Sequence, residues 1–195
     1  MPSRTIELVF DASGPVLGID PGLSRCGYGA VARDGQTMTA VACGVVRTDP
    51  DEELPIRLAT LQDELAALVS ELRPSALAVE RVLFQANVRT AMTTGQASGL
   101  ALAVAARANV PVTHYSPNEV KLAVAGYGAA EKAQVQDMVA RLLRLDVPPR
   151  PADAADALAL AVCHSWSAPV RLATDGPPNR GLDRAVAAAL ARDGS

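Results

Sequence analysis

The chain has 195 residues, of which 49% are hydrophobic and 20% charged, and its formal net charge is −3. This length fits one domain with a full hydrophobic core, and the composition is ordinary for a soluble globular protein. Taken alone, the acidic balance argues against nucleic acid as a partner.

Three further observations narrow the class of protein. The longest weakly polar run starts at Ser98 and is interrupted by Arg107 and Pro111, which leaves it too short to span a membrane. Glu7 and Asp11 lie inside the only apolar segment near the N-terminus, so residues 1–14 are interpreted as a short extension and not as a secretory signal. The three cysteines lack CxxC spacing, which indicates a reduced, cytoplasmic protein without a disulfide framework or zinc site.

One domain is expected over residues 15–166, and its first half begins with strands. Residues 15–20, 27–35 and 38–48 are predicted to form three strands connected by hairpins, because Pro-Gly and Asp-Gly turns separate them. Residues 55–73 are predicted to form an amphipathic helix, since their leucines recur at spacings of three and four. A fully apolar strand follows at 75–80 and ends at Glu80.

In the second half, a helix is expected at 89–109, a strand at 111–116 and three helical stretches up to about Trp166. This order predicts an α/β fold with a mixed five-stranded sheet, a three-strand antiparallel meander plus parallel strands, flanked by helices. Residues 167–195 are rich in Pro, Gly and Arg and are interpreted as a partly disordered tail, in which only 181–193 is expected to form a helix.

Four acidic residues fall where chemistry is expected. Asp20 and Glu80 each close a strand, and ligands of such sheets bind at the carboxyl ends of the strands. Asp153 and Asp156 are three residues apart, on one face of the last helix, where like charges repel. If the four meet, they form an oxygen-only site that suits Mg²⁺ or Mn²⁺ and not zinc, and two such ions would clamp a phosphodiester.

Each acid also has an ordinary structural interpretation, and the spacing leaves both open. Asp153 follows Pro151 and fits the first turn of a helix, where it complements the helix dipole. Asp20 precedes Pro-Gly and fits a turn. Glu80 and Asp156 fit such roles less well, because their neighbours in the chain are apolar and a half-buried carboxylate needs a partner.

Four separated segments carry a resemblance to a known family. The segments are LGIDPGLSRCGYG, LAVERVLF, SPNEVKLAVAGYGAAEKAQVQDMV and DAADALALAV, and their order and spacing resemble those of the RuvC family of Holliday-junction resolvases from about Val16 to His164. The resemblance implies an RNase H-like fold, a homodimer and two symmetric nicks in a four-way DNA junction. It also implies that Asp20, Glu80, Asp153 and Asp156 are catalytic ligands of Mg²⁺ or Mn²⁺, two ions per site.

The same resemblance assigns residues that contact DNA. Lys121 and Lys132 match lysines near the DNA backbone and the scissile phosphate, although by sequence alone they read as solvated helix lysines. Arg25, Arg81 and Arg89 flank the acidic motifs and are candidate phosphate contacts, which position DNA without reading its sequence. Without the four candidate ligands the formal charge changes from −3 to +1, which weakens the objection to a DNA partner.

Two features admit more than one interpretation. The family places an aromatic wedge three positions after the strand-end glutamate, where this chain has Leu83 followed by Phe84; either acts as the wedge, or both pack in the core. Gly95 and Gly99 permit close approach of another backbone. Composition favours packing on the protein's own sheet, while the resemblance makes this helix a candidate dimer interface.

Rival functions fit the sequence less well. A ribosomal-RNA-processing nuclease of the same fold would lack the segments EKAQVQDMV and DAADALALA. A kinase-like ATPase that opens with GIDPG would need a second domain and a further glycine-rich motif, and a binding module without catalysis would not need all four acids. The resemblance adds branch-migration proteins of the RuvA/RuvB kind as partners. Neither His114 nor His164 has ligand spacing, and no catalytic role is assigned to them.

Overall fold

The computed structural model describes residues 14–82 and 88–174. The chain divides into two units, residues 1–165 and 166–195, and the sheet, the first four helices and the last helix as far as Ser165 belong to the first. The expected N-terminal extension lies outside the described residues except for Gly14, as does the expected helix at 181–193. No described helix combines the length and the apolar character that crossing a bilayer requires.

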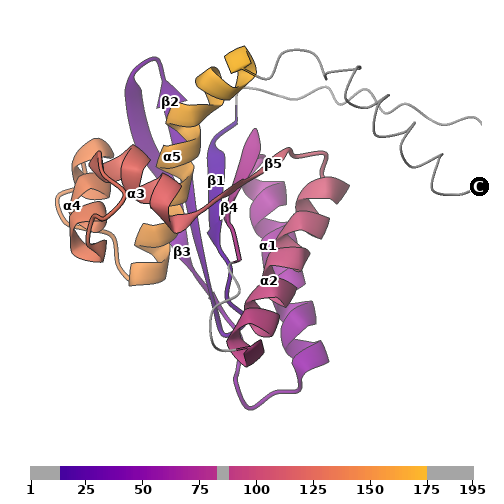
Figure 1. Ribbon diagram of the computed structural model, residues 1–195. Helices are drawn as coiled ribbons and strands as arrows, with labels where there is room; N and C mark the ends of the chain where they lie inside the picture. The colour runs from indigo at the N-terminus through magenta and orange to yellow at the C-terminus, as the bar shows by residue number, and fades with distance from the viewer. Residues whose placement is uncertain (1–13, 83–87, 175–195) are drawn as a thin grey trace, which may run out of the picture. The chain divides into compact units, whose positions relative to one another are not determined.

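A mixed five-stranded sheet forms the centre of the first unit (Figure 1). Its strands are β1 (Val16–Asp20), β2 (Arg25–Asp34), β3 (Thr37–Arg47), β4 (Ala76–Glu80) and β5 (Val112–Tyr115), in the spatial order β3-β2-β1-β4-β5. β1, β2 and β3 pair antiparallel, whereas β4 is parallel to both β1 and β5. The predicted meander followed by parallel strands is therefore confirmed.

Helices cover both faces of this sheet (Figure 1). α1 (Leu54–Leu72) and α2 (Val88–Arg107) lie together on one face, while α5 (Ala152–Thr174) lies on the other. α3 (Pro117–Ala125) and α4 (Lys132–Leu142) follow β5 and lie on the α5 side. Helix α5 was expected to end near Trp166 but continues to Thr174, with Pro169 inside it. A proline inside a helix costs about 3 kcal/mol but does not always end it, and Arg171, Leu172 and Ala173, which follow, are good helix formers.

The alternation of side chains along the strands separates the two faces. Leu17 and Ile19 of β1, and Leu77 and Val79 of β4, are buried in one core cluster. That cluster also contains residues of α1 and α2, namely Leu61, Leu65, Val69, Ala97, Ala101, Val104 and Ala105. Because successive residues of a strand point to opposite faces, Gly18 and the two strand-end acids point to the α5 side.

The α5 side of β1 and β2 is built from glycines, which let the helix approach closely. A Cβ atom at Gly18 would lie 1.9 Å from the carbonyl oxygen of Ala157, and one at Gly27 would lie 2.2 Å from that of Asp153. Neither distance is possible for a real side chain, so only glycine fits at these positions. The backbone of α5 therefore rests directly on the sheet, with its first turn beside the carboxyl end of β1.

A carboxylate cluster at the carboxyl end of the parallel strands

Asp20 and Glu80 are neighbours at one edge of the sheet. β1 and β4 are paired in parallel with Ile19 opposite Val79, so the next residue on each strand is one of the two acids. Asp20 is also the register partner of Gly27, the glycine on which the first turn of α5 rests. The strand ends thus bring together two acids that are 60 positions apart in the sequence.

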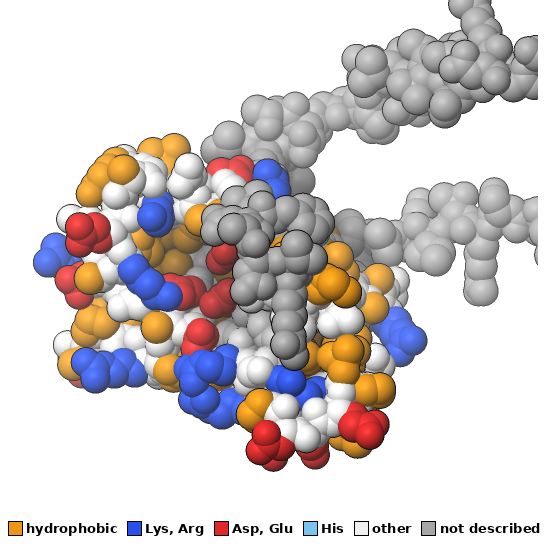
Figure 2. Space-filling view, turned by 60° about the horizontal axis from the view of Figure 1, so that its bottom comes forward, with side chains coloured by type: hydrophobic (Ala, Val, Ile, Leu, Met, Phe, Trp, Pro, Cys, Tyr) orange, Lys and Arg blue, Asp and Glu red, His pale blue; other side chains and the backbone are white. Residues whose placement is uncertain are grey.

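Helix α5 adds the other two acids to this edge. Asp156 and Glu80 line one cavity of about 250 Å³, together with Lys121, Lys132 and the apolar residues Pro117, Val120, Val135, Ala159 and Leu160. The charges of Asp153, Asp156 and Glu80 all act on Asp20. Figure 2 shows acidic side chains gathered in a hollow of this face, with Lys and Arg side chains beside them. The structure therefore brings all four sequence-predicted acids into one cluster.

Burial and mutual repulsion shift the pKa values of the residues in this cluster. Burial, and then the nearby charges of Glu80, Asp156 and Asp153, raise the pKa of Asp20 from 3.8 to about 7, and Lys132 opposes this rise. Burial and the charge of Asp156 also raise the pKa of Glu80. Burial lowers the pKa of Lys132, but its hydrogen bond to Asp156 and the surrounding carboxylates outweigh that effect and the net shift is upward. The fold thus disfavours the charged form of both strand-end acids.

Arg25 and Lys132 form ion pairs with the two acids of α5. Arg25 donates two hydrogen bonds to Oδ2 of Asp153, from Nε at 2.9 Å and from an Nη at 2.5 Å. The ammonium of Lys132 lies 2.5 Å from Oδ2 of Asp156. With the side chains so placed, no three His, Cys, Asp or Glu residues in the described part of the chain are arranged to hold a metal ion.

The donor chemistry nevertheless fits hard divalent cations. All four acids supply oxygen, and Asp20 and Glu80 have no ion pair among the described residues. Burial, and then an excess of neighbouring negative charge, raises the pKa values of these two acids. A divalent ion relieves such an excess, and oxygen-only sites favour Mg²⁺ or Mn²⁺. The set therefore suits the metal that the sequence resemblance implies.

The candidate DNA contacts are placed unevenly. Lys121 and Lys132 line the same cavity as Glu80 and Asp156. Arg81 directly follows Glu80, is exposed, and its backbone N–H donates to the carbonyl of Tyr115 at 2.8 Å. Leu83 and Phe84 lie outside the described residues. Arg89 lies in the first turn of α2, and its side chain is likewise outside the described part.

Three features of the structure were not foreseen. Arg25, interpreted as a phosphate contact, is paired with Asp153, and no local signal could predict a contact between residues 128 positions apart. His164 is buried and lies 3.0 Å from the hydroxyl of Tyr115, the register partner of Glu80. Gly95 and Gly99 are exposed with open space around them, so the composition-based prediction that they pack on the protein's own sheet was wrong.

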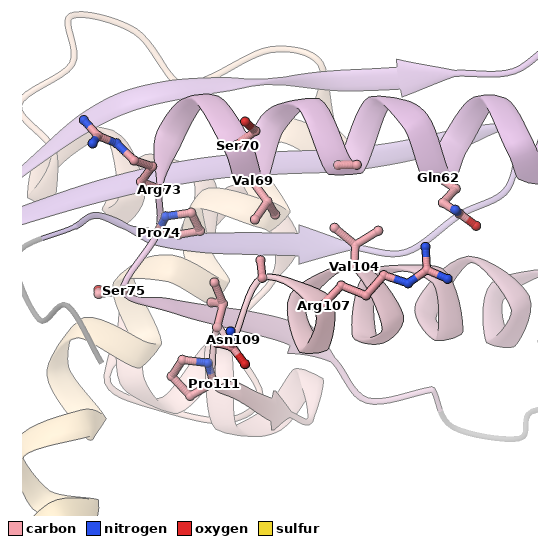
Figure 3. A pocket seen from close by; sticks show the side chains of 13 residues that line it. Gln62, Val69, Ser70, Arg73, Pro74, Ser75, Val104, Arg107, Asn109 and Pro111 are labelled. Atoms are coloured by element: carbon pink, nitrogen blue, oxygen red, sulfur yellow. The ribbon is translucent and has the colours of Figure 1, made fainter. Parts of the chain in front are cut away.

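A second, larger cavity lies elsewhere in the unit. It has a volume of about 720 Å³ and lies between the C-terminal ends of α1 and α2, near the start of β4 and β5 (Figure 3). None of the four acids lines it. Arg73 and Arg107 border it but point in different directions, so they do not converge on a common anion.

Comparisons with known proteins agree on one family. The profile described as "Crossover junction endodeoxyribonuclease RuvC" matches residues 16–164. A protein of that name from Salinispora arenicola is 62% identical over 152 residues, covering 77% of this chain and 87% of the relative, and one from Streptomyces avermitilis is 55% identical, covering 80% and 89%. The solved structure of "T. thermophilus RuvC in complex with Holliday junction substrate" superposes with a TM-score of 0.76 at 38% identity, covering 80% of this chain and 94% of that one.

Proposed function

This chain belongs to the RuvC family of crossover junction endodeoxyribonucleases, and we propose that Asp20, Glu80, Asp153 and Asp156 are the residues with which it cuts Holliday junctions. The enzyme is a nuclease of recombination and repair, and its fold is the RNase H-like fold of the family. The observation that carries the proposal is the meeting of two strand-end acids with two acids of α5 at one edge of the sheet.

The family's nucleases are metal-dependent, and here the four carboxylates would hold the metal. We propose two ions, Mg²⁺ or Mn²⁺, per site. When bound, such ions stabilise the charge that develops on the phosphodiester and favour deprotonation of the attacking water. The carboxylates supply only oxygen donors, and none of them is required as a covalent nucleophile.

The reaction is a hydrolysis in which a water oxygen forms a bond to phosphorus while the bond from phosphorus to the 3′-oxygen breaks. Asp20 and Glu80 lie on paired strands, with Gly27 and Tyr115 as their register partners, and this pairing fixes the backbone of both acids. Lys132 lies beside Asp156 and places a positive charge where the scissile phosphate would approach the carboxylates. Lys121 lines the same cavity and provides a second contact to the backbone, with Arg81 and Arg89 further along the DNA.

Two symmetric nicks need two active sites, and we propose that a homodimer provides them. Met92 on α2 is 61% exposed, and Gly95 and Gly99 lie on the same helix with nothing within 4 Å of an added Cβ. A helix with small exposed residues permits close approach of the same helix from a second copy, and a two-fold dimer matches a two-fold junction. Either Leu83 or Phe84 is proposed as the wedge at the crossover, since both follow Glu80 closely in sequence.

A Holliday-junction substrate also suggests where the protein works and with which partners. We propose that the dimer works on junctions in the cytoplasm together with RuvA/RuvB-like branch-migration proteins. The name of the Thermus thermophilus structure records a Holliday junction as that protein's substrate, which supports the same substrate for this chain.

Nicking of a labelled four-way junction tests the proposal, with a linear duplex of matching sequence as the competing substrate. The wild-type protein is expected to make paired nicks in the junction alone with Mg²⁺ or Mn²⁺. Asp156→Asn is expected to bind the junction and cut it at least about 1,000-fold more slowly, because it removes one ligand oxygen and its charge. Equal cutting of linear duplex, or full activity of Asp156→Asn, would contradict the proposal.

A further inference from the structure

The contact between Arg25 and Asp153 connects strand β2 to helix α5 beside the carboxylate cluster. Arg25 opens β2, and Asp153 lies in the first turn of α5. Two nitrogens of the guanidinium donate to the same oxygen, Oδ2, at 2.9 and 2.5 Å. Such charge-assisted hydrogen bonds are stronger than neutral ones and occupy the lone pairs of that oxygen. Asp153 is therefore held, and one of its oxygens is already used.

The pair is accessible to water. The side chain of Arg25 is 42% exposed and that of Asp153 is 27% exposed. Exposed ion pairs contribute little to stability, because water solvates both partners well when they separate. The guanidinium can therefore leave the carboxylate at a small cost in free energy.

A neighbouring arginine shows that the pairing is specific to one position. Arg47 on β3 is the register partner of Arg25, is exposed, and forms no ion pair with any described residue. Like charges directly opposite each other on adjacent strands destabilise a sheet slightly. Of the two cations at this strand edge, Arg25 alone meets an acid of the cluster.

We propose that Arg25 is an exchangeable counter-ion for Asp153: its guanidinium holds the carboxylate in the metal-free protein and releases it when a divalent cation binds. The inference rests on the proposed function, in which Asp153 is a metal ligand. Two charges of the same sign cannot share one carboxylate oxygen without repulsion, so entry of the cation favours departure of the guanidinium. Arg25 thus lowers the affinity of the site for metal and keeps its acids ordered while the metal is absent.

Calorimetric titration of Mn²⁺ into the full-length protein without DNA tests this exchange. Arg25→Gln is expected to bind Mn²⁺ roughly three- to tenfold more tightly than the wild type, because the competing charge is gone. Arg47→Gln, the matched control, removes the same charge from the same strand edge and is expected to change the affinity by less than about twofold. Arg25→Lys keeps a charge near Asp153 and is expected to bind Mn²⁺ much like the wild type.

The variant Asp153→Asn separates this inference from the proposed function. Asp153→Asn is expected to weaken Mn²⁺ binding, and adding Arg25→Gln to it is expected to bring no further tightening, since the carboxylate to be released is gone. Thermal melts of each variant confirm that it is folded, and Arg25→Met serves if Arg25→Gln is not. If Arg25→Gln binds Mn²⁺ no more tightly than Arg47→Gln while Asp153→Asn binds it weakly, the exchange is wrong. If Asp153→Asn binds Mn²⁺ like the wild type, the ligand assignment itself is wrong.

Discussion

Gly18 in the middle of β1 meets Ala157 on α5 so closely that a Cβ at Gly18 would lie 1.9 Å from the Ala157 carbonyl oxygen. The clash would be with backbone, which cannot move aside as a flexible side chain can. This contact sets the height of α5 above the sheet and therefore the distance of Asp153 and Asp156 from the strand-end acids. A substitution here would act on the carboxylate cluster through packing alone.

Gly18→Ala is accordingly expected to destabilise the protein by at least about 2 kcal/mol, as overpacking of a tight core contact does. The variant is also expected to lose junction cleavage, because α5 must shift away from the sheet. Urea denaturation and single-turnover cleavage measure the two effects. Gly128→Ala is the control, since a Cβ added at Gly128 would lie 3.8 Å from its nearest neighbour, the carbonyl oxygen of Asn118. This variant is expected to change the free energy of unfolding by less than about 0.5 kcal/mol. Wild-type stability and activity in Gly18→Ala would show that α5 does not rest on β1 as described.

The pKa of Asp20 predicts how the metal-free protein responds to pH. Its rise from 3.8 to about 7 means that the fold favours the protonated acid. The contribution of this group to stability is present in full below about pH 4 and is lost as the pH rises toward 7. In EDTA, the melting temperature of Asp20→Asn relative to the wild type is therefore expected to increase between pH 5 and pH 8.

Adding Mg²⁺ should offset the loss of wild-type stability at high pH. Mg²⁺ needs the ionised carboxylates, so it is expected to raise the melting temperature of the wild type more at pH 8 than at pH 5. Asp20→Asn is expected to gain less from Mg²⁺ at either pH. Thermal melts with EDTA or with Mg²⁺ at the two pH values provide all four comparisons. A Mg²⁺ effect that is equal at pH 5 and pH 8 would argue against Asp20 as a ligand.

The sequence predicts the acids of the site better than their partners. The strand ends at Asp20 and Glu80 follow from short apolar runs, and the helix carrying Asp153 and Asp156 follows from its alanine-rich periodicity. These are local patterns, and strand pairing then brings the acids together. The contact of Arg25 with Asp153 depends on how α5 sits on the sheet, which no local pattern encodes.

The sequence likewise does not predict which face of α2 is buried against the rest of the protein. Gly, Ala and Thr occur on all sides of this helix, so its apolar face is weakly marked. The structure buries Ala97 and Ala101 and leaves Gly95 and Gly99 exposed. Composition alone could not decide between these faces, because small residues fit either a sheet or a second helix.

Lys132 and Lys121 line the same cavity but should have different effects on catalysis. Lys132 lies 2.5 Å from Asp156, whereas no ion pair with a described residue is found for Lys121. If the charge of Lys132 acts at the scissile phosphate as proposed, Lys132→Met is expected to slow single-turnover cleavage about 100-fold while junction binding persists. Lys121→Met is expected mainly to weaken junction binding, by a few-fold at moderate salt. Rate constants at saturating enzyme, with binding measured separately in Ca²⁺, distinguish the two. Equal rates for both variants would show that Lys132 has no special place beside the phosphate.

The exposed face of α2 predicts the oligomeric state. Gly95→Leu adds a side chain where nothing lies within 4 Å, so the fold should tolerate it, and replacing glycine inside a helix improves helix propensity. If α2 packs against its copy, that side chain separates the two helices, and the variant is expected to be monomeric at concentrations where the wild type is dimeric. Sedimentation equilibrium measures the change. Ala59→Leu, which adds a similar side chain at an exposed position of α1, is expected to leave the dimer intact.

Monomeric Gly95→Leu should also lose paired nicking while it still binds Mn²⁺, because each carboxylate cluster lies within one chain. A Gly95→Leu variant that remains dimeric and makes paired nicks would place the interface elsewhere.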